Sequence, residues 1–79
     1  MRTVHLIKIE DVYYDQIIDG SKKFEVRYND RGYQTGDHIK FHRPIGRIER
    51  EGLWEIIYVH SGLGMKEMFV VLGIARIDR

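Results

Sequence analysis

Gly20-Ser21-Lys22-Lys23-Phe24-Glu25-Val26-Arg27-Tyr28 is the stretch that decides the fold of this 79-residue chain. From Lys22 onward, apolar and charged residues alternate, with Phe24, Val26 and Tyr28 on one face and Lys23, Glu25 and Arg27 on the other. This period of two predicts an amphipathic strand. Gly20 suits the left-handed residue that ends a helix. The chain therefore changes from helix to sheet at this point.

Upstream of this stretch we predict one strand and one helix. Residues Thr3 to Ile9 alternate in polarity, as a partly buried strand does. In Val12 to Asp19, apolar residues recur at helical spacing, and Asp11 is placed to act as the N-cap. The helix then ends before Gly20.

Downstream, short apolar runs are separated by turns, which predicts further strands. The expected strands are Lys22–Tyr28, His38–His42, Leu53–His60 and Phe69–Ile77, and Pro44 to Gly52 forms a polar, basic loop. One helix with several closely spaced strands predicts an α+β, mainly β fold, in which a small, largely antiparallel sheet curls towards a barrel and the helix closes one side. Tyr28, Tyr33 and Trp54 are candidates for stacking on bases if they are exposed, but for Tyr28 and Trp54 we expect packing in the core instead.

The composition limits the class of protein. At 43% hydrophobic and 32% charged residues, the chain can bury one core, so residues 1–79 are expected to form a single domain. With no cysteine, disulfides and thiolate sites are excluded. No apolar run approaches the length of a membrane span or a signal peptide, so we expect a cytoplasmic protein without a membrane partner. Nothing in the sequence indicates a bound cofactor.

The positive charge is concentrated in the middle of the chain. The net charge is only +1, but residues 21–50 hold eight Lys and Arg against four Asp and Glu. Three of these arginines, Arg43, Arg47 and Arg50, fall in or beside the predicted loop, where they are candidates for contacting a nucleic-acid backbone. The alternative is that they only keep a surface hairpin in solution.

Glu25 and Arg27 lie on the same face of the predicted strand. A carboxylate beside Arg27 and Lys23 stays ionised and is oriented by its cations, so the pair offers an acceptor next to a donor. This arrangement suits recognition of a nucleobase or nucleotide. The alternative is a solvated strand face with ordinary ion pairs.

The same residues fit the pattern GxKxxExR, and here the chain resembles the ASCH family of the PUA-like superfamily. Further likeness lies in His5–Ile9, Asn29-Asp30-Arg31, Gly36-Asp37 and Gly62-Leu63 before Phe69–Leu72, which together resemble a small phage and Gram-positive branch known as a domain of unknown function. The resemblance implies a PUA-like barrel whose motif lines a cleft beside the helix, and it implies RNA binding.

By that resemblance Lys22, Glu25 and Arg27 are the residues that line the cleft and contact the ligand. If the domain is a binding module, we expect Arg31 and the loop from Arg43 to Arg50 to add electrostatic attraction. His5 is a secondary ligand-binding candidate, because a histidine on a half-buried strand is also a common structural residue. The expected partner is RNA or a modified nucleotide.

Two other functions remain open. One branch of the superfamily hydrolyses acetylcytidine with a Lys and a Thr three residues later; Lys22 matches the Lys, but Glu25 stands where the Thr would be. In an amidohydrolase Glu25 would instead be the general base and Lys22 would stabilise the oxyanion. The other alternative is a phage-type domain that binds a protein.

We expect no metal site. His38 and His42 share one strand face but lie about 13 Å apart, which is too far to chelate a single ion.

Overall fold

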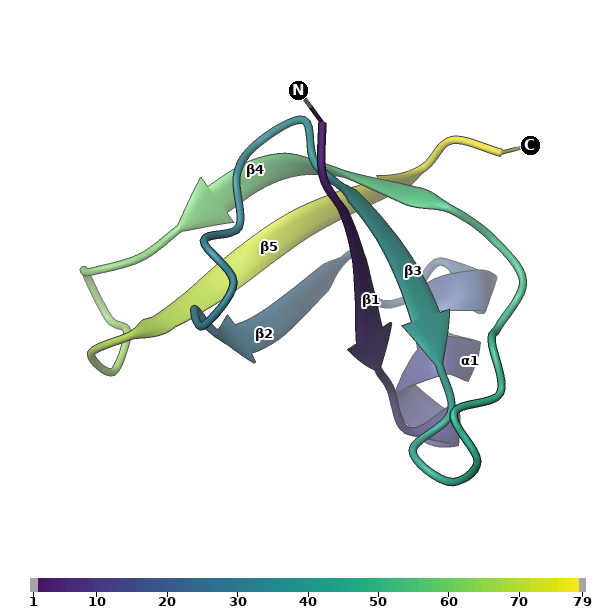
Figure 1. Ribbon diagram of the computed structural model, residues 1–79. Coiled ribbons are helices and arrows are strands. Elements are labelled where there is room, and N and C mark those ends of the chain that lie inside the picture. Colours follow the sequence, from purple (N-terminus) through teal and green to yellow (C-terminus); the bar gives the residue numbers. More distant parts are fainter. Residues whose placement is uncertain (1, 79) are drawn as a thin grey trace.

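The computed structural model describes residues 2–78, which form one curled sheet and one helix (Figure 1). The elements are β1 (Val4–Lys8), α1 (Asp11–Asp19), β2 (Phe24–Tyr28), β3 (His38–His42), β4 (Trp54–His60) and β5 (Phe69–Arg76). The predicted α+β, mainly β fold class is confirmed. Among the described residues no helix has the length and apolar character needed to cross a membrane.

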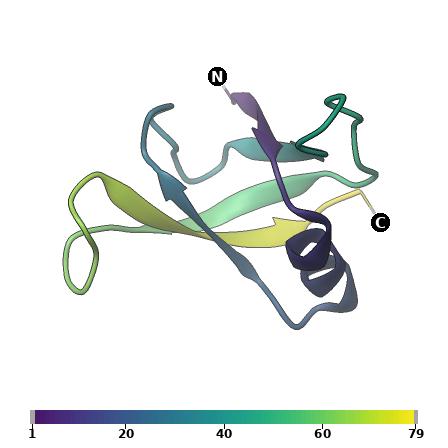
Figure 2. The same cartoon turned by 90° about the horizontal axis from the view of Figure 1, so that it is seen from below.

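The five strands form a half-barrel in the order β1-β3-β4-β5-β2. Neighbouring strands are antiparallel except for β1 and β3, which are parallel. Strands β1 and β2 are therefore the two edges of the sheet. Figure 2 shows α1 at one end of the curl, between the end of β1 and the start of β2.

Helix α1 begins one residue earlier than predicted, and Asp11 is not its N-cap. Glu10 takes the extended N-cap conformation without a side-chain capping bond, and Asp11 is the first helical residue. The Asp11 carboxylate pairs instead with Arg43 and Arg50, so tertiary ion pairs replace the local cap. Gly20 ends the helix in the left-handed conformation as predicted, with φ of 86°.

The core fills the inside of the curl. The largest fully buried side chains are Ile7, Ile39, Phe41, Ile56 and Leu72. Trp54 packs beside them with its ring centroid 5.2 Å from that of Phe41, which confirms its predicted core position. From α1, Tyr14 and Ile17 cover the same core.

Strand β2 is inverted relative to an ordinary amphipathic strand. Its apolar residues Phe24, Val26 and Tyr28 are 44%, 49% and 51% exposed, whereas Glu25 is only 4% exposed. The predicted core position of Tyr28 is therefore wrong. The alternation was predicted, but the direction in which each face points depends on the ion pairs that receive Glu25 inside the curl.

Candidate functional site

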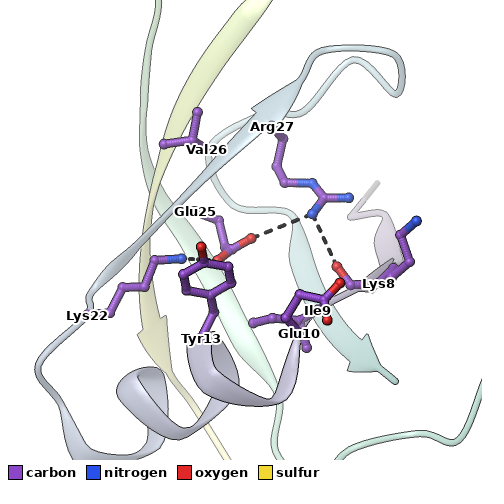
Figure 3. Close-up of a pocket in the computed structure, with 8 residues that line it drawn as sticks. All are labelled: Lys8, Ile9, Glu10, Tyr13, Lys22, Glu25, Val26 and Arg27. Atoms are coloured by element: carbon purple, nitrogen blue, oxygen red, sulfur yellow. Dashed lines mark hydrogen bonds and ion pairs between the residues drawn. The ribbon is translucent and has the colours of Figure 1, made fainter. Parts of the chain in front are cut away.

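A cleft of about 420 Å³ lies where the half-barrel is open, between the two edge strands and α1. Strand β2 and the residues before it form one wall, and the end of β1 with the start of α1 forms the other (Figure 3). The lining residues are Lys8, Ile9, Glu10, Tyr13, Lys22, Glu25, Val26 and Arg27. The three motif residues predicted to contact a ligand are therefore brought together at one opening.

Glu25 is held between two cations at the floor of this cleft. Its Oε1 accepts a hydrogen bond from Lys22 Nζ, and its Oε2 lies 3.6 Å from Arg27 Nη1. The side chains of Lys22 and Arg27 are 17% and 26% exposed, so both cations remain reachable from the cleft. The buried carboxylate is thus balanced by charge and fixed in direction.

The prediction that Lys23 is the lysine beside Glu25 is wrong. Lys23 is exposed and lines a different hollow, beside Trp54 and Ile74. Lys22 lies just before β2, where the chain is still turning from α1, and this places its ammonium group on Glu25 three residues later. Strict alternation applies only within the strand, so it does not predict where Lys22 points.

Tyr13 is a cleft residue that the sequence did not identify. The Lys22 ammonium lies 5.0 Å from the centroid of the Tyr13 ring and 5.3 Å from that of Phe24. The Tyr13 ring is 48% exposed and stands in front of Glu25 in Figure 3. Two adjacent residues of a helix point in different directions, so Tyr13 and Tyr14 cannot both face the core, and only Tyr14 is buried. The sequence therefore contained a signal that one of the two tyrosines is exposed beside the motif.

Arg27 also joins the two edges of the sheet. Thr3 and Ile9 bond to β3 through their backbones, so by alternation the Leu6 and Lys8 carbonyls point to the free edge of β1. Arg27 Nη1 donates to Lys8 O at 3.1 Å, and Arg31 Nη1 donates to Leu6 O at 2.6 Å. In a closed barrel, backbone hydrogen bonds would join the edge strands β1 and β2. Here two guanidinium groups bridge the gap between these strands, which we call the seam.

Arg31 and His5 do not line the cleft. Arg31 follows β2 and is used at the seam. His5 is 6% exposed; its Nε2 lies 2.9 Å from Asp37 Oδ2, and its ring centroid lies 4.7 Å from that of Tyr33. Of the two roles considered for His5, ligand binding and a structural role, these contacts favour the structural one.

Asp37 anchors the turn before β3. Its carboxylate accepts hydrogen bonds from the backbone N–H groups of Thr3 and Gln34 in addition to its contact with His5. Burial by itself raises the pKa of Asp37, but the hydrogen bonds from His5, Thr3 and Gln34 together outweigh it and hold that pKa below its usual value. The Gly36-Asp37 pair thus serves the fold.

The three loop arginines have different surroundings. Arg43 contacts Asp11 through Nη2 at 2.8 Å and Nε at 3.3 Å, and Arg50 Nη2 pairs with the same carboxylate. The Arg50 guanidinium also lies 4.6 Å from the Tyr14 ring centroid. Arg47 is exposed, and no ion pair joins it to another of residues 2–78. Two of the three arginines therefore fasten the loop to α1.

Comparison with known proteins places these features in a family. The profile of a family described as a domain of unknown function, DUF3850, matches residues 4–74. The chain belongs to this family. The match runs from β1 into β5 and includes every residue that lines the cleft.

One curated relative comes from a bacteriophage. The chain is 36% identical over 42 residues to an uncharacterized 12.9 kDa protein in the GpA 3′ region of Escherichia phage P2. The aligned part is 53% of this chain and 38% of the phage protein, so the chain spans well under half of that relative. The predicted likeness to a phage-type domain of unknown function is confirmed by these two matches.

Proposed function

We propose that this DUF3850 domain binds RNA or a modified nucleotide in the cleft between β1, α1 and β2. The observation that carries the proposal is the buried Glu25 carboxylate, held between Lys22 and Arg27 at the floor of an open cleft. Such an array accepts a hydrogen bond from an exocyclic amine and donates to a carbonyl or phosphate oxygen.

The dimensions and charge of the cleft support a nucleotide-sized ligand. Its volume of about 420 Å³ falls in the range of small-molecule sites, roughly 300–1,000 Å³. Three cations, Lys8, Lys22 and Arg27, face two acids, Glu10 and Glu25, which leaves an excess positive charge for a phosphate. The Tyr13 ring at the mouth offers a surface on which a base can stack.

We also propose that the domain is an ASCH-type member of the PUA-like superfamily. The support is the agreement between the implied and observed arrangements: a curled sheet, one helix and a GxKxxExR segment that lines a cleft between them. RNA binding is the activity that this relationship implies.

A hydrolytic version of the same site is favoured by one contact, the hydrogen bond between Lys22 and Glu25. Glu25 would take a proton from an attacking water, and Lys22 would stabilise the oxyanion that forms on an acetyl amide. Release of acetate from acetylcytidine distinguishes this candidate from simple binding.

The proposal is tested by titrating the protein with cytidine, acetylcytidine and short single-stranded RNAs. Replacing Tyr13 by Leu should weaken binding by about 1–3 kcal/mol because a stacking surface is lost. Ile18→Ala is the control, since Ile18 is also exposed on α1 and does not line the cleft. Equal affinities for wild type and Tyr13→Leu would exclude stacking in the cleft, and failure of every ligand to bind would overturn the proposal.

The loop arginines give a second test, because only Arg47 is free to meet a phosphate. Arg47→Gln should lower the slope of log affinity against log salt by about one without changing Tm. Arg50→Gln should instead lower Tm by roughly 4–8 °C, since it loses its contacts with Asp11 and Tyr14, worth about 1 kcal/mol. Thermal melts and salt titrations of both variants check this division. An unchanged salt slope in Arg47→Gln would show that the loop does not contact phosphates.

A further inference from the structure

The outer face of β2, β5 and β4 is an uncovered apolar surface. The register places Phe24, Gly73 and Tyr58 in one row, Val26, Val71 and His60 in the next, and Tyr28 with Phe69 in a third. On β5 the alternate residues Val70, Leu72 and Ile74 are buried, so the residues between them point outward. We call the eight residues of the three rows the outer patch: Phe24, Val26, Tyr28, Tyr58, His60, Phe69, Val71 and Gly73.

The outer patch contains no Asp, Glu, Lys or Arg. Its aromatic residues are well exposed, with Phe24 at 44%, Tyr28 at 51% and Tyr58 at 62%. The rings of Tyr28 and Phe69 pack edge to face with centroids 5.6 Å apart, so each ring restricts the orientation of the other. A contiguous exposed patch of this kind marks an interaction surface.

The absence of charged side chains narrows the occupant. None of the eight patch residues offers a cation to a phosphate or a counter-charge to a strongly charged peptide, and Lys22, whose ammonium lies 5.3 Å from the Phe24 ring at the edge of the patch, is already paired with Glu25. An occupant whose own surface is apolar and uncharged fits, and a second copy of this chain presents such a surface.

The patch can meet a second copy of itself face to face. Gly73 carries no side chain between Phe24 and Tyr58, and the space above it is already filled, because a Cβ there would lie 3.3 Å from Tyr58 Cβ. A two-fold axis would place the same uncharged rows of both copies opposite each other, as a symmetric interface requires.

The exposed area sets the strength of such a dimer. A fully exposed aromatic side chain has a surface of about 150–250 Å². The patch residues are partly exposed, and together their exposed surface amounts to roughly 500 Å² per copy. Pairing would bury about 1,000 Å² in total, which is the lower limit of a specific interface and below the 1,600 Å² of a typical stable one. The expected complex is therefore weak and concentration-dependent.

We propose that the outer patch is the interface of a weak symmetric homodimer. Most of the outer patch lies on the far side of β2 from the cleft: Glu25 and Arg27 point into the cleft, whereas the side chain of Val26, which borders the cleft, points away from them (Figure 3). Dimerisation leaves the cleft open, and the inference does not depend on the ligand proposed for it.

Sedimentation velocity between about 10 and 500 µM tests the proposal. Wild type should pass from a 9.4 kDa monomer to twice that mass, with a dissociation constant on the order of 100 µM. Tyr28→Lys on β2 and Tyr58→Lys on β4 should each raise that constant at least about tenfold, because like charges meet across the interface. Ile45→Lys is the control, since Ile45 is 88% exposed in the loop after β3, away from the patch. Circular dichroism verifies that each variant is folded.

A wild-type monomer at every concentration would overturn the proposal, as would a dimer that both patch variants leave intact. If a monomer instead showed shifts of the Phe24 and Tyr58 resonances on addition of short RNA, the patch would be a nucleic-acid surface. Using two patch variants on different strands keeps the result interpretable if one of them misfolds.

Discussion

Replacing Glu25 by Gln is expected to weaken ligand binding by about 1–3 kcal/mol, or roughly 5- to 150-fold in Kd. The amide cannot accept the hydrogen bonds of two cations and a ligand as a carboxylate does, and one of its ends becomes a donor. Isothermal titration with the tightest of the ligands above measures the loss.

The same substitution should also lower stability, which the sequence alone did not indicate. On a solvated strand face the change would cost almost nothing, but Glu25 is 4% exposed and balances two cations. Since Lys22 and Arg27 keep some access to water, the cost should fall below the 3–5 kcal/mol of a fully buried broken pair, at about 2 kcal/mol. For a domain of this size, this lowers Tm by roughly 8–16 °C.

Glu10→Gln is the matched control because it removes the same charge from an exposed residue of the same cleft. If Glu25→Gln lowers Tm and leaves every Kd unchanged, Glu25 serves only the fold. If it keeps the Kd and slows acetate release by a factor of about 100, the hydrolytic candidate is correct. No acetate release by wild type removes that candidate for acetylcytidine.

Replacing Asp37 by Asn is expected to have the second largest effect, a loss of about 1–3 kcal/mol at pH 7. The buried carboxylate accepts from His5, Thr3 and Gln34, and an amide cannot satisfy the three donors equally. Asp15→Asn, on the exposed side of α1, provides the control. Urea unfolding at pH 7 compares the three proteins.

The pH dependence of stability follows from the lowered pKa of Asp37. A carboxyl group with a depressed folded-state pKa contributes its full stabilisation above its unfolded pKa and loses it as the pH falls through the folded value. Wild type should therefore lose stability below about pH 4. Two other titratable or charged groups lie near the Asp37 carboxylate: His5 on β1 is in direct contact with it, and Arg2 lies at the same surface.

In Asp37→Asn this acid-dependent loss should be smaller, because the group that takes up the proton has been removed. Unfolding free energies measured from pH 2 to pH 7 give both curves. Parallel curves would mean that another carboxyl group controls the acid limb.

The segments on which the sequence comparison with ASCH proteins was based divide into two kinds once their contacts are known. His5 and Asp37 bind one another, Asn29 accepts from the Tyr33 backbone, and Arg31 holds the edge of β1. These residues serve the fold. Lys22, Glu25 and Arg27 instead line the open cleft, which is where we propose that the ligand binds.

Sequence periodicity by itself determined the helix and the five strands, with ends within one or two residues of those observed, because alternation and helical spacing are local properties of the chain. Periodicity also placed Glu25 and Arg27 on one face of the strand, whereas Lys22 was predicted only from the resemblance of the GxKxxExR segment. Only the tertiary structure decided which way β2 faces, which lysine reaches Glu25 and which arginines are already paired. Those outcomes depend on contacts between residues far apart in sequence, such as Arg27 with the Lys8 carbonyl and Arg50 with Asp11, and no local pattern encodes them.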